Sequence, residues 1–190
     1  MNILIEQLPT AIEIDGREYE VNADFRNCLK IILAFEDNEL TLTEKKAVML
    51  ELLYKEMPEN ITEAVRLGIK FLDCGEVQKK EPSPEDTRRV FSFKKDAQYI
   101  YTAIKQSHDI DLEDIPYLHY WKFCYMFQDI KEDCFFSNIL YYRNQRNKGK
   151  LTKEEREYCA KIHDILDLPQ NEDAEATKAK SEFLQILGKS

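Results

Sequence analysis

Apolar residues in the central part of the chain recur mostly every three or four positions, which is the period of one face of a helix. This pattern predicts three helices, at residues 96–107, 117–128 and 134–144. The second of them is apolar around most of its circumference, and a helix of that kind is usually buried on several sides. The acidic segment 109–112 is too short for a further helix. We therefore expect residues 96–146 to form the helical centre of the protein.

Residues 3–21 instead show the pattern of a β-hairpin. Segments 11–14 and 18–21 alternate apolar and polar residues, as half-buried strands do. Asp15 and Gly16 between them suit a two-residue turn, which requires positive φ at both central positions. The sequence thus begins with a predicted antiparallel pair of strands, whose edge could also join another copy of the chain.

Three more helices are predicted between the hairpin and residue 75, at residues 24–35, 43–56 and 61–73. Asn22 or Asp24 can cap the first by accepting a backbone N–H bond. Thr41 and Glu44 have the spacing of a capping box before the second. Gly75 suits a left-handed cap after the third. In the second helix, Ala47, Leu50, Leu53 and Tyr54 are expected to face inward.

The remaining segments complete a four-part division of the chain. We expect a hairpin and three-helix part at 1–75, a charged linker with two prolines at 76–90, an aromatic-rich helical part at 91–168 and a flexible tail at 169–190 that could form a short helix. Together they predict one compact, mainly α domain, with an N-terminal β-hairpin followed by a bundle of about six to eight helices.

Two details of the third part complete this prediction. Phe91 and Phe93 form either a short extended piece or an anchor under the helices, and 94–96 next to them is expected to be a solvated face. Thr152 opens another helix, expected over residues 153–166.

Charge and composition narrow the function classes. The formal net charge is −9, which disfavours nucleic acid as a partner, because binding phosphates needs clustered Lys and Arg. The N-terminus lacks the positive region and the sustained apolar run of a signal peptide, and no run is long enough to span a bilayer. The five cysteines form no C-x-x-C pair, so we expect buried, reduced thiols in a cytosolic protein.

Three constellations were considered as reactive sites. Cys159, His163 and Asp167 are four apart and would share one face of a helix, but a structural zinc site needs four ligands. The acids at 109–114 fail the calcium-loop template, whose sixth residue is Gly and twelfth is Glu. His119 and Cys124 are poorly spaced for a nucleophile and its base. We therefore predict a protein that is not an enzyme, with no catalytic, cofactor-binding or metal-binding residues.

Aromatic residues give the candidate binding surface. Most of the many aromatic side chains between 117 and 142 are expected in the core, but there are more of them than one helix face needs. Tyr and Trp are frequent anchors of protein interfaces. The predicted partner-binding residues are Tyr117, Tyr120, Trp121 and Tyr125.

The same stretch resembles the C-terminal half of the bacteriophage Gp15 family. That family typically shows an Asp-x-x-x-Ile-Tyr helix, an Ile-Asp-Leu turn, a Leu-His-Trp-Trp-x-Phe helix and an aliphatic helix that ends in Arg. Tyr120 stands where many members have Trp. The resemblance covers residues 85–147 well and the N-terminal half only in outline. The matching residues are Asp96, Ile100, Tyr101, Ile110, Asp111, Leu112, Leu118, His119, Trp121, Phe123 and Arg143.

The resemblance implies a function in the assembly of phage tails. A member of this family is expected to be a non-enzymatic chaperone in the cytoplasm of the bacterial host, where it binds the tape measure protein and keeps it soluble. The tail tube protein is a further candidate partner, and copies of the chaperone could associate along one client. The alternative that stays open is a structural tail or tail-completion protein retained in the virion.

Overall fold

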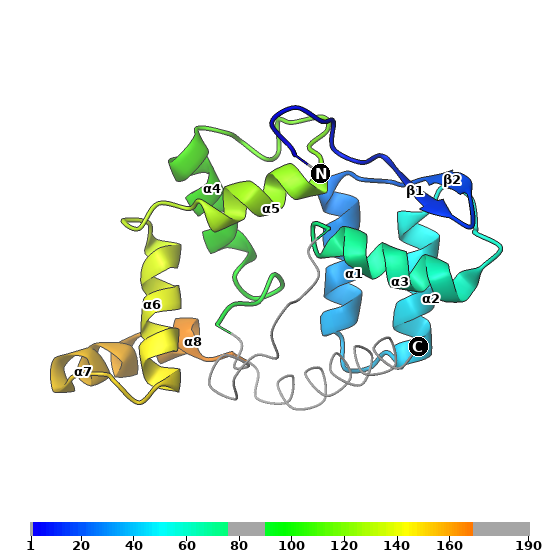
Figure 1. Ribbon diagram of the computed structural model, residues 1–190. Helices are drawn as coiled ribbons and strands as arrows, with labels where there is room; N and C mark the ends of the chain where they lie inside the picture. Colours follow the sequence, from blue (N-terminus) through cyan, green and yellow to red (C-terminus); the bar gives the residue numbers. More distant parts are fainter. Residues whose placement is uncertain (1, 76–89, 169–190) are drawn as a thin grey trace. The chain divides into compact units, whose positions relative to one another are not determined.

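The computed structural model describes residues 2–75 and 90–168, which contain a two-stranded sheet and eight helices (Figure 1). The predicted mainly α fold with an N-terminal hairpin is confirmed. The described residues fall into two compact units, the first made of 2–75 and 117–125 and the second of 90–116 and 126–168. The predicted linker, apart from Val90, and the predicted tail with its short helix lie outside the described residues.

The hairpin has the predicted turn. Strand β1 (Ala11–Ile14) pairs antiparallel with β2 (Arg17–Glu20), so that Ile12 lies opposite Tyr19. Asp15 and Gly16 both have positive φ, 52° and 81°, as a two-residue turn of this type requires. The predicted hairpin of residues 3–21 begins too early. Residues 3–10 precede the strands, and the chain forms a turn at 2–6.

Three helices follow the hairpin in the first unit. Helix α1 (Phe25–Glu36) and α2 (Leu42–Leu53) form an antiparallel pair, and α3 (Ile61–Leu72) runs across α2 (Figure 1). Asp24 caps α1, and Thr41 and Glu44 form the predicted capping box of α2. At the end of α3 the chain turns through Gly75 at φ 78°, which confirms the left-handed cap.

Helix α2 ends three residues earlier than predicted, because its last residues bond to the hairpin. The Lys55 N–H donates to the Glu20 carbonyl at 3.0 Å, and Tyr54 forms a β-bridge with Val21. Leu50, Leu53 and Tyr54 are buried as expected, whereas Ala47 is exposed and Met49 takes the inward position. Gly68 allows α3 to approach α2 closely, since a Cβ there would lie 3.1 Å from Leu53 Cδ2.

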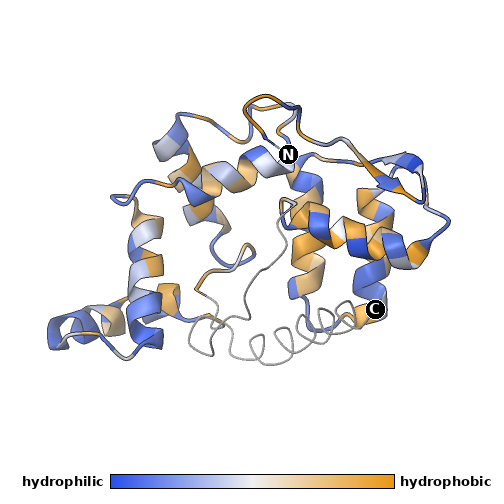
Figure 2. Cartoon of the chain, in the orientation of Figure 1, coloured by the Kyte–Doolittle hydropathy of each residue, from blue (hydrophilic) through white to orange (hydrophobic). Residues whose placement is uncertain are grey.

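The second unit is built from the remaining helices. They are α4 (Ala97–His108), the last residues of α5 (Tyr120–Gln128), α6 (Phe135–Asn147), α7 (Lys153–Lys161) and α8 (His163–Leu166). The predicted helix over 153–166 is broken at Ile162, and this break turns Leu166 into the core. Figure 2 shows that α7 itself is mostly hydrophilic, which fits a helix with a single buried residue, Cys159.

The segment before α4 anchors the second unit through its aromatic rings. Phe91 and Phe93 each lie about 5 Å from Phe127, at 5.0 and 5.4 Å between ring centroids. Phe127 in turn contacts Phe136 at 5.8 Å. Of the two predicted roles for Phe91 and Phe93, the structure therefore supports the anchor. In the parts of the chain that the structure describes, no helix combines the length and the apolar character that crossing a membrane requires.

Candidate functional site

The most deeply buried charges of the second unit belong to Asp96 and Arg143. Their side chains are 0% and 1% exposed and meet in a two-pronged ion pair, Nη1 to Oδ2 at 2.6 Å and Nη2 to Oδ1 at 2.9 Å. A planar guanidinium matches a carboxylate in this way, with two parallel hydrogen bonds. The prediction that Asp96 lies on a solvated face is therefore wrong. The reason is that Arg143, 47 residues away, compensates its charge.

Arg143 also ties three segments together. Its Nη1 donates to the Val90 carbonyl at 3.0 Å, Nη2 to that of Ile165 at 2.7 Å and Nε to that of Leu166 at 2.9 Å. The helix break at Ile162 brings the last two carbonyls within reach. Asp96 meanwhile accepts the Ser92 N–H. All of these partners satisfy buried polar groups, so the pair holds the segment at 90–96, α6 and α8 in one arrangement.

The segment at 117–125 returns to the first unit and begins with backbone pairing. Phe25 N donates to the Leu118 carbonyl at 2.9 Å, and Tyr120 N donates to the Ala23 carbonyl at 2.7 Å. Asp24 bonds to both helix α1 and the segment at 117–125. One of its carboxylate oxygens accepts from Arg26 N, and the other accepts from Leu118 N. This pairing explains why α5 begins at Tyr120 and not at Tyr117 as predicted.

His119 is a buried core histidine. Its Nδ1 accepts the Trp121 N–H at 3.1 Å, so the proton belongs on Nε2, which faces the Pro9 carbonyl at 3.0 Å. Burial lowers the pKa of His119, which favours the neutral ring. The imidazole thus caps the start of α5 and fastens the segment before the hairpin.

The four predicted partner-binding residues divide into buried and accessible ones. Tyr120 and Trp121 are buried, and the Trp121 Nε1–H donates to the Phe71 carbonyl at 2.8 Å. Tyr117 is 54% exposed and Tyr125 is half-buried. Their role in binding stays a prediction. Tyr117 offers the largest accessible aromatic surface of the four. Trp121 instead fixes the segment at 117–125 to the end of α3 through its bond to Phe71.

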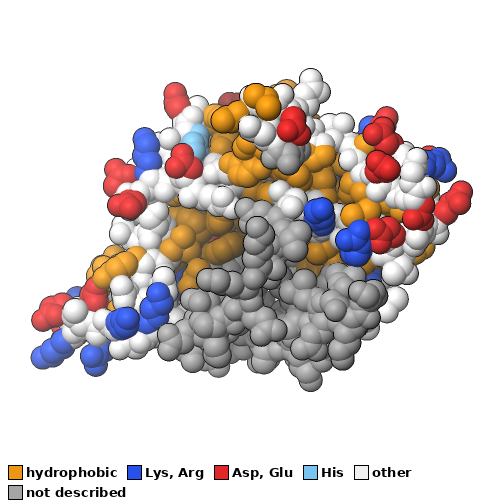
Figure 3. Space-filling view, in the orientation of Figure 1, with side chains coloured by type: hydrophobic (Ala, Val, Ile, Leu, Met, Phe, Trp, Pro, Cys, Tyr) orange, Lys and Arg blue, Asp and Glu red, His pale blue; other side chains and the backbone are white. Residues whose placement is uncertain are grey.

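A second apolar surface lies near the N-terminus, where the sequence analysis had expected part of the hairpin. Leu4 and Ile5 are 88% and 81% exposed, and Ile3 beside them is also exposed. The turn is held by Asn2, whose carbonyl accepts from Glu6 N at 2.9 Å and whose side chain accepts from Leu4 N. Figure 3 shows hydrophobic side chains at the surface of this N-terminal segment. Contiguous exposed apolar residues of this kind mark interaction sites.

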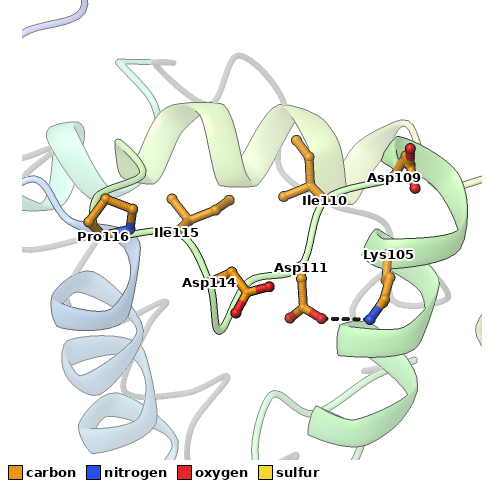
Figure 4. A pocket seen from close by; sticks show the side chains of 7 residues that line it. All are labelled: Lys105, Asp109, Ile110, Asp111, Asp114, Ile115 and Pro116. Atoms are coloured by element: carbon orange, nitrogen blue, oxygen red, sulfur yellow. Dashed lines mark hydrogen bonds and ion pairs between the residues drawn. The ribbon is translucent and has the colours of Figure 1, made fainter.

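A surface hollow of about 540 Å³ lies beside the loop that follows α4 (Figure 4). Two of the charged side chains that line it, Lys105 and Asp111, form an ion pair with each other. Lys105 Nζ lies 2.6 Å from Asp111 Oδ2, and the Tyr101 hydroxyl donates to the other oxygen. These bonds, that to Lys105 first, lower the pKa of Asp111 to about 2. Asp109 points away from this pair in Figure 4. The acids therefore shape the turn, since Asp111 also accepts from the backbone N–H groups of Glu113 and Asp114.

The cysteine and histidine residues that the sequence offered as candidate reactive sites bond to other partners and not to each other. The break at Ile162 divides Cys159 from His163, and Asp167 pairs with Arg146 at 2.6 Å. Cys124 faces Cys74 and Tyr120, whereas His119 faces Pro9. Within residues 2–75 and 90–168, no three His, Cys, Asp or Glu side chains come close enough together to hold a metal ion.

Comparison with known proteins decides the family. The family model described as Bacteriophage Gp15 protein matches residues 4–168, from the N-terminal turn to the end of the second unit. The chain belongs to the bacteriophage Gp15 family. Membership makes it a bacteriophage protein and indicates the structural or head–tail-related class. The comparisons gave no match to a curated protein or to a solved structure.

The Gp15 match extends the resemblance seen in the sequence. That resemblance was strong at 85–147, whereas the family model also covers the hairpin and the first three helices. The ion pair was missed because nothing in the spacing links Asp96 to Arg143. The available signal was that both belong to the residues that carry the resemblance. The exposed turn at 2–6 was missed because residues 3–10 were included in the predicted hairpin.

Proposed function

We propose that this Gp15 protein is a non-enzymatic tail assembly chaperone, which binds the tape measure protein and keeps it soluble while the tail tube assembles. The observation that carries the proposal is membership in a phage family over residues 4–168. A tape measure is expected to expose long apolar helical stripes, which aggregate unless they are covered. A chaperone for such a client needs an accessible apolar surface of its own.

The N-terminal turn is the surface that would make this contact. Ile3, Leu4 and Ile5 stand on a turn that Asn2 and Glu6 hold in place, so little further ordering would be needed on binding. Tyr117 is the aromatic residue that would add to it. The net charge of −9 would keep the complex soluble and makes nucleic acid an unsuitable partner. The site of action would be the cytoplasm of the bacterial host.

Co-expression with the tape measure protein of the same phage tests the proposal. We expect the tape measure to be insoluble alone and to elute with the chaperone in a multi-copy complex during size-exclusion chromatography with light scattering. Leu4→Asp should abolish the complex. Met57→Asp is the matched control, because it makes the same kind of change at another exposed apolar residue, and should retain it.

Three results would change the proposal in different ways. A tape measure that stays insoluble beside the folded wild-type protein would contradict the chaperone function. Finding the protein in purified virions in fixed stoichiometry would favour the alternative, a structural tail or tail-completion protein. Equal binding by Leu4→Asp and wild type would leave the function and remove the N-terminal turn as its site.

A further inference from the structure

Strand β1 of the hairpin has one edge without a neighbouring strand. The Val21 N–H donates to the Thr10 carbonyl at 2.9 Å, and bonded pairs alternate with open pairs along an antiparallel ladder. Ala11 and Glu13 occupy the open pairs, so their backbone N–H and C=O groups point away from β2. Within residues 2–75 and 90–168, none of these groups has a hydrogen-bond partner. We call them the open edge of β1.

The corresponding edge of β2 is already occupied. The Lys55 N–H donates to the Glu20 carbonyl at 3.0 Å, and Lys55 Nζ pairs with the Glu20 carboxylate at 2.7 Å. Arg17 of β2 pairs with Glu56 at 2.6 Å. The segment after α2 thus lies along β2, whereas Glu13 on β1 is exposed. Because unpaired backbone groups at an edge are a template for a further strand, β1 is the side of the hairpin that can accept one.

The side chains at the open edge indicate which strand would fit. Side chains alternate between the two faces of a strand, so Glu13 lies on one face and Ile12 on the other, with the buried Ile14. Glu18 stands directly opposite Glu13, and both are exposed. Like charges in this position repel each other, and among the described residues neither acid forms an ion pair. Figure 3 shows acidic side chains at the surface around the hairpin.

We propose that the open edge of β1 binds an extended segment of another protein in which Lys or Arg residues alternate with an apolar residue. The segment would add a strand through the backbone groups of Ala11 and Glu13, which is a recurring mode of peptide recognition. One cation of the segment would lie beside Glu13 and offset its repulsion with Glu18. The apolar residue between two cations would lie beside Ile12 and extend the inner face of the hairpin.

The same acids disfavour a second copy of this chain as the occupant. Residues 10–14 contain Glu13 and no Lys or Arg, so two β1 strands would bring further negative charge to the edge without a cation. Charged residues at the edge of a sheet protect it from self-pairing in this way. Repulsion of one partner and attraction of another together give specificity. The site uses residues outside the N-terminal turn, so it does not depend on the proposed chaperone function.

Three fluorescently labelled peptides test the edge by anisotropy with the full-length protein. The first, Thr-Lys-Val-Lys-Val-Lys-Thr, has the proposed pattern and should bind. The second has Glu in place of each Lys. The third carries Nα-methyl groups on its Lys residues, which keeps the charge but removes the backbone donors that would face β1. Neither of these two should bind measurably. With the first peptide, hydrogen exchange followed by NMR should slow at the Ala11 and Glu13 amides.

A matched pair of variants locates the site on one strand. Glu13→Pro removes an N–H of the open edge and should abolish binding, whereas Glu18→Pro removes the N–H of the opposite residue on β2 and should retain it. Glu13→Lys leaves the backbone intact and reverses the charge. It should weaken binding of the Lys peptide about fivefold to tenfold and allow the Glu peptide to bind. Trp121 emission checks that the first unit is folded in each variant.

Four results would overturn the proposal. The first is that the folded wild type does not bind the Lys peptide, and the second is that it binds all three peptides equally. The third is equal binding by Glu13→Pro, Glu18→Pro and the wild type. The fourth is a dimer in which the Ala11 and Glu13 amides are protected without peptide, because the edge would then belong to a second copy.

Discussion

At the scale of single residues, the Asp96–Arg143 pair combines a high desolvation cost with nearly complete compensation. Both charges are buried, and Arg143 donates to three backbone carbonyls besides the carboxylate. Replacing one partner of such a pair leaves the other charge buried and unpaired, which costs far more than the pair contributes net. We therefore expect the pair mainly to specify one packing of the segments that it joins.

Arg143→Met should lower the free energy of unfolding by about 3–5 kcal/mol, because Asp96 and three carbonyls lose their donor. Urea unfolding measures this change. Arg66→Met, which removes a largely exposed ion pair with Glu63, should cost only about 0.5 kcal/mol. The double variant Asp96→Asn/Arg143→Met should lose less than the sum of the two single variants, and strict additivity would contradict the pairing.

Asp111 provides a residue-scale prediction for pH. Its pKa is lowered from 3.8 to about 2 in the folded protein, so the ionised form is the stabilised one. The stabilisation is present above about pH 4 and is lost as the pH falls towards about 2. Titration followed by NMR should place the midpoint near 2, and Lys105→Met or Tyr101→Phe should raise it. A wild-type midpoint near 4 would exclude the contacts with Lys105 and Tyr101.

At the scale of elements, tertiary pairing decides where helices begin and end. Helix α5 starts late because Leu118 and Tyr120 form backbone hydrogen bonds with Phe25 and Ala23 at the start of α1. Helix α2 stops early because Lys55 bonds to the hairpin. In both cases a backbone group that could continue the helix has found a partner far away in the sequence.

Asp24→Ala tests the joint between α1 and this segment. The change removes the cap of Arg26 N and the acceptor of Leu118 N, and we expect a loss of about 2–4 kcal/mol in the free energy of unfolding. Asp24→Asn keeps one oxygen and should lose less. Thr41→Ala, which removes a cap that serves a single helix, should lose about 1 kcal/mol. Equal losses for Asp24→Ala and Thr41→Ala would show that the bond to Leu118 contributes nothing.

At the scale of the whole molecule, the described residues form two compact units. The first contains Trp121, the one tryptophan of the chain, and the second contains the Asp96–Arg143 pair. The emission of Trp121 therefore reports on the first unit, whereas far-UV circular dichroism reports on the helices of both. A variant that weakens the second unit can show whether the two unfold together.

For Asp96→Asn we expect two transitions in urea. Circular dichroism should fall first, as the second unit unfolds, and Trp121 emission should change at a higher urea concentration. The wild type provides the reference for both signals, and Arg66→Met serves as a control with coincident curves. Coincident curves in Asp96→Asn as well would mean that the two units unfold as one cooperative block.

The sequence by itself determined the elements whose causes are local. The turn at Asp15 and Gly16, the capping box of Thr41 and Glu44 and the cap at Gly75 each depend on neighbouring residues, and all were predicted correctly. The hydrophobic period placed the helices, although their ends shifted. The family resemblance also followed from the sequence, because it rests on a linear order of residue types.

Only the tertiary structure decided which distant groups meet. Asp96 with Arg143 and Asp24 with Leu118 are partners across 47 and 94 residues. No periodicity encodes such a pairing, because it results from how the helices pack and where the backbone groups left at their ends find partners. The exposure of the turn at 2–6 was decided in the same way, since an apolar run is buried only where another element covers it.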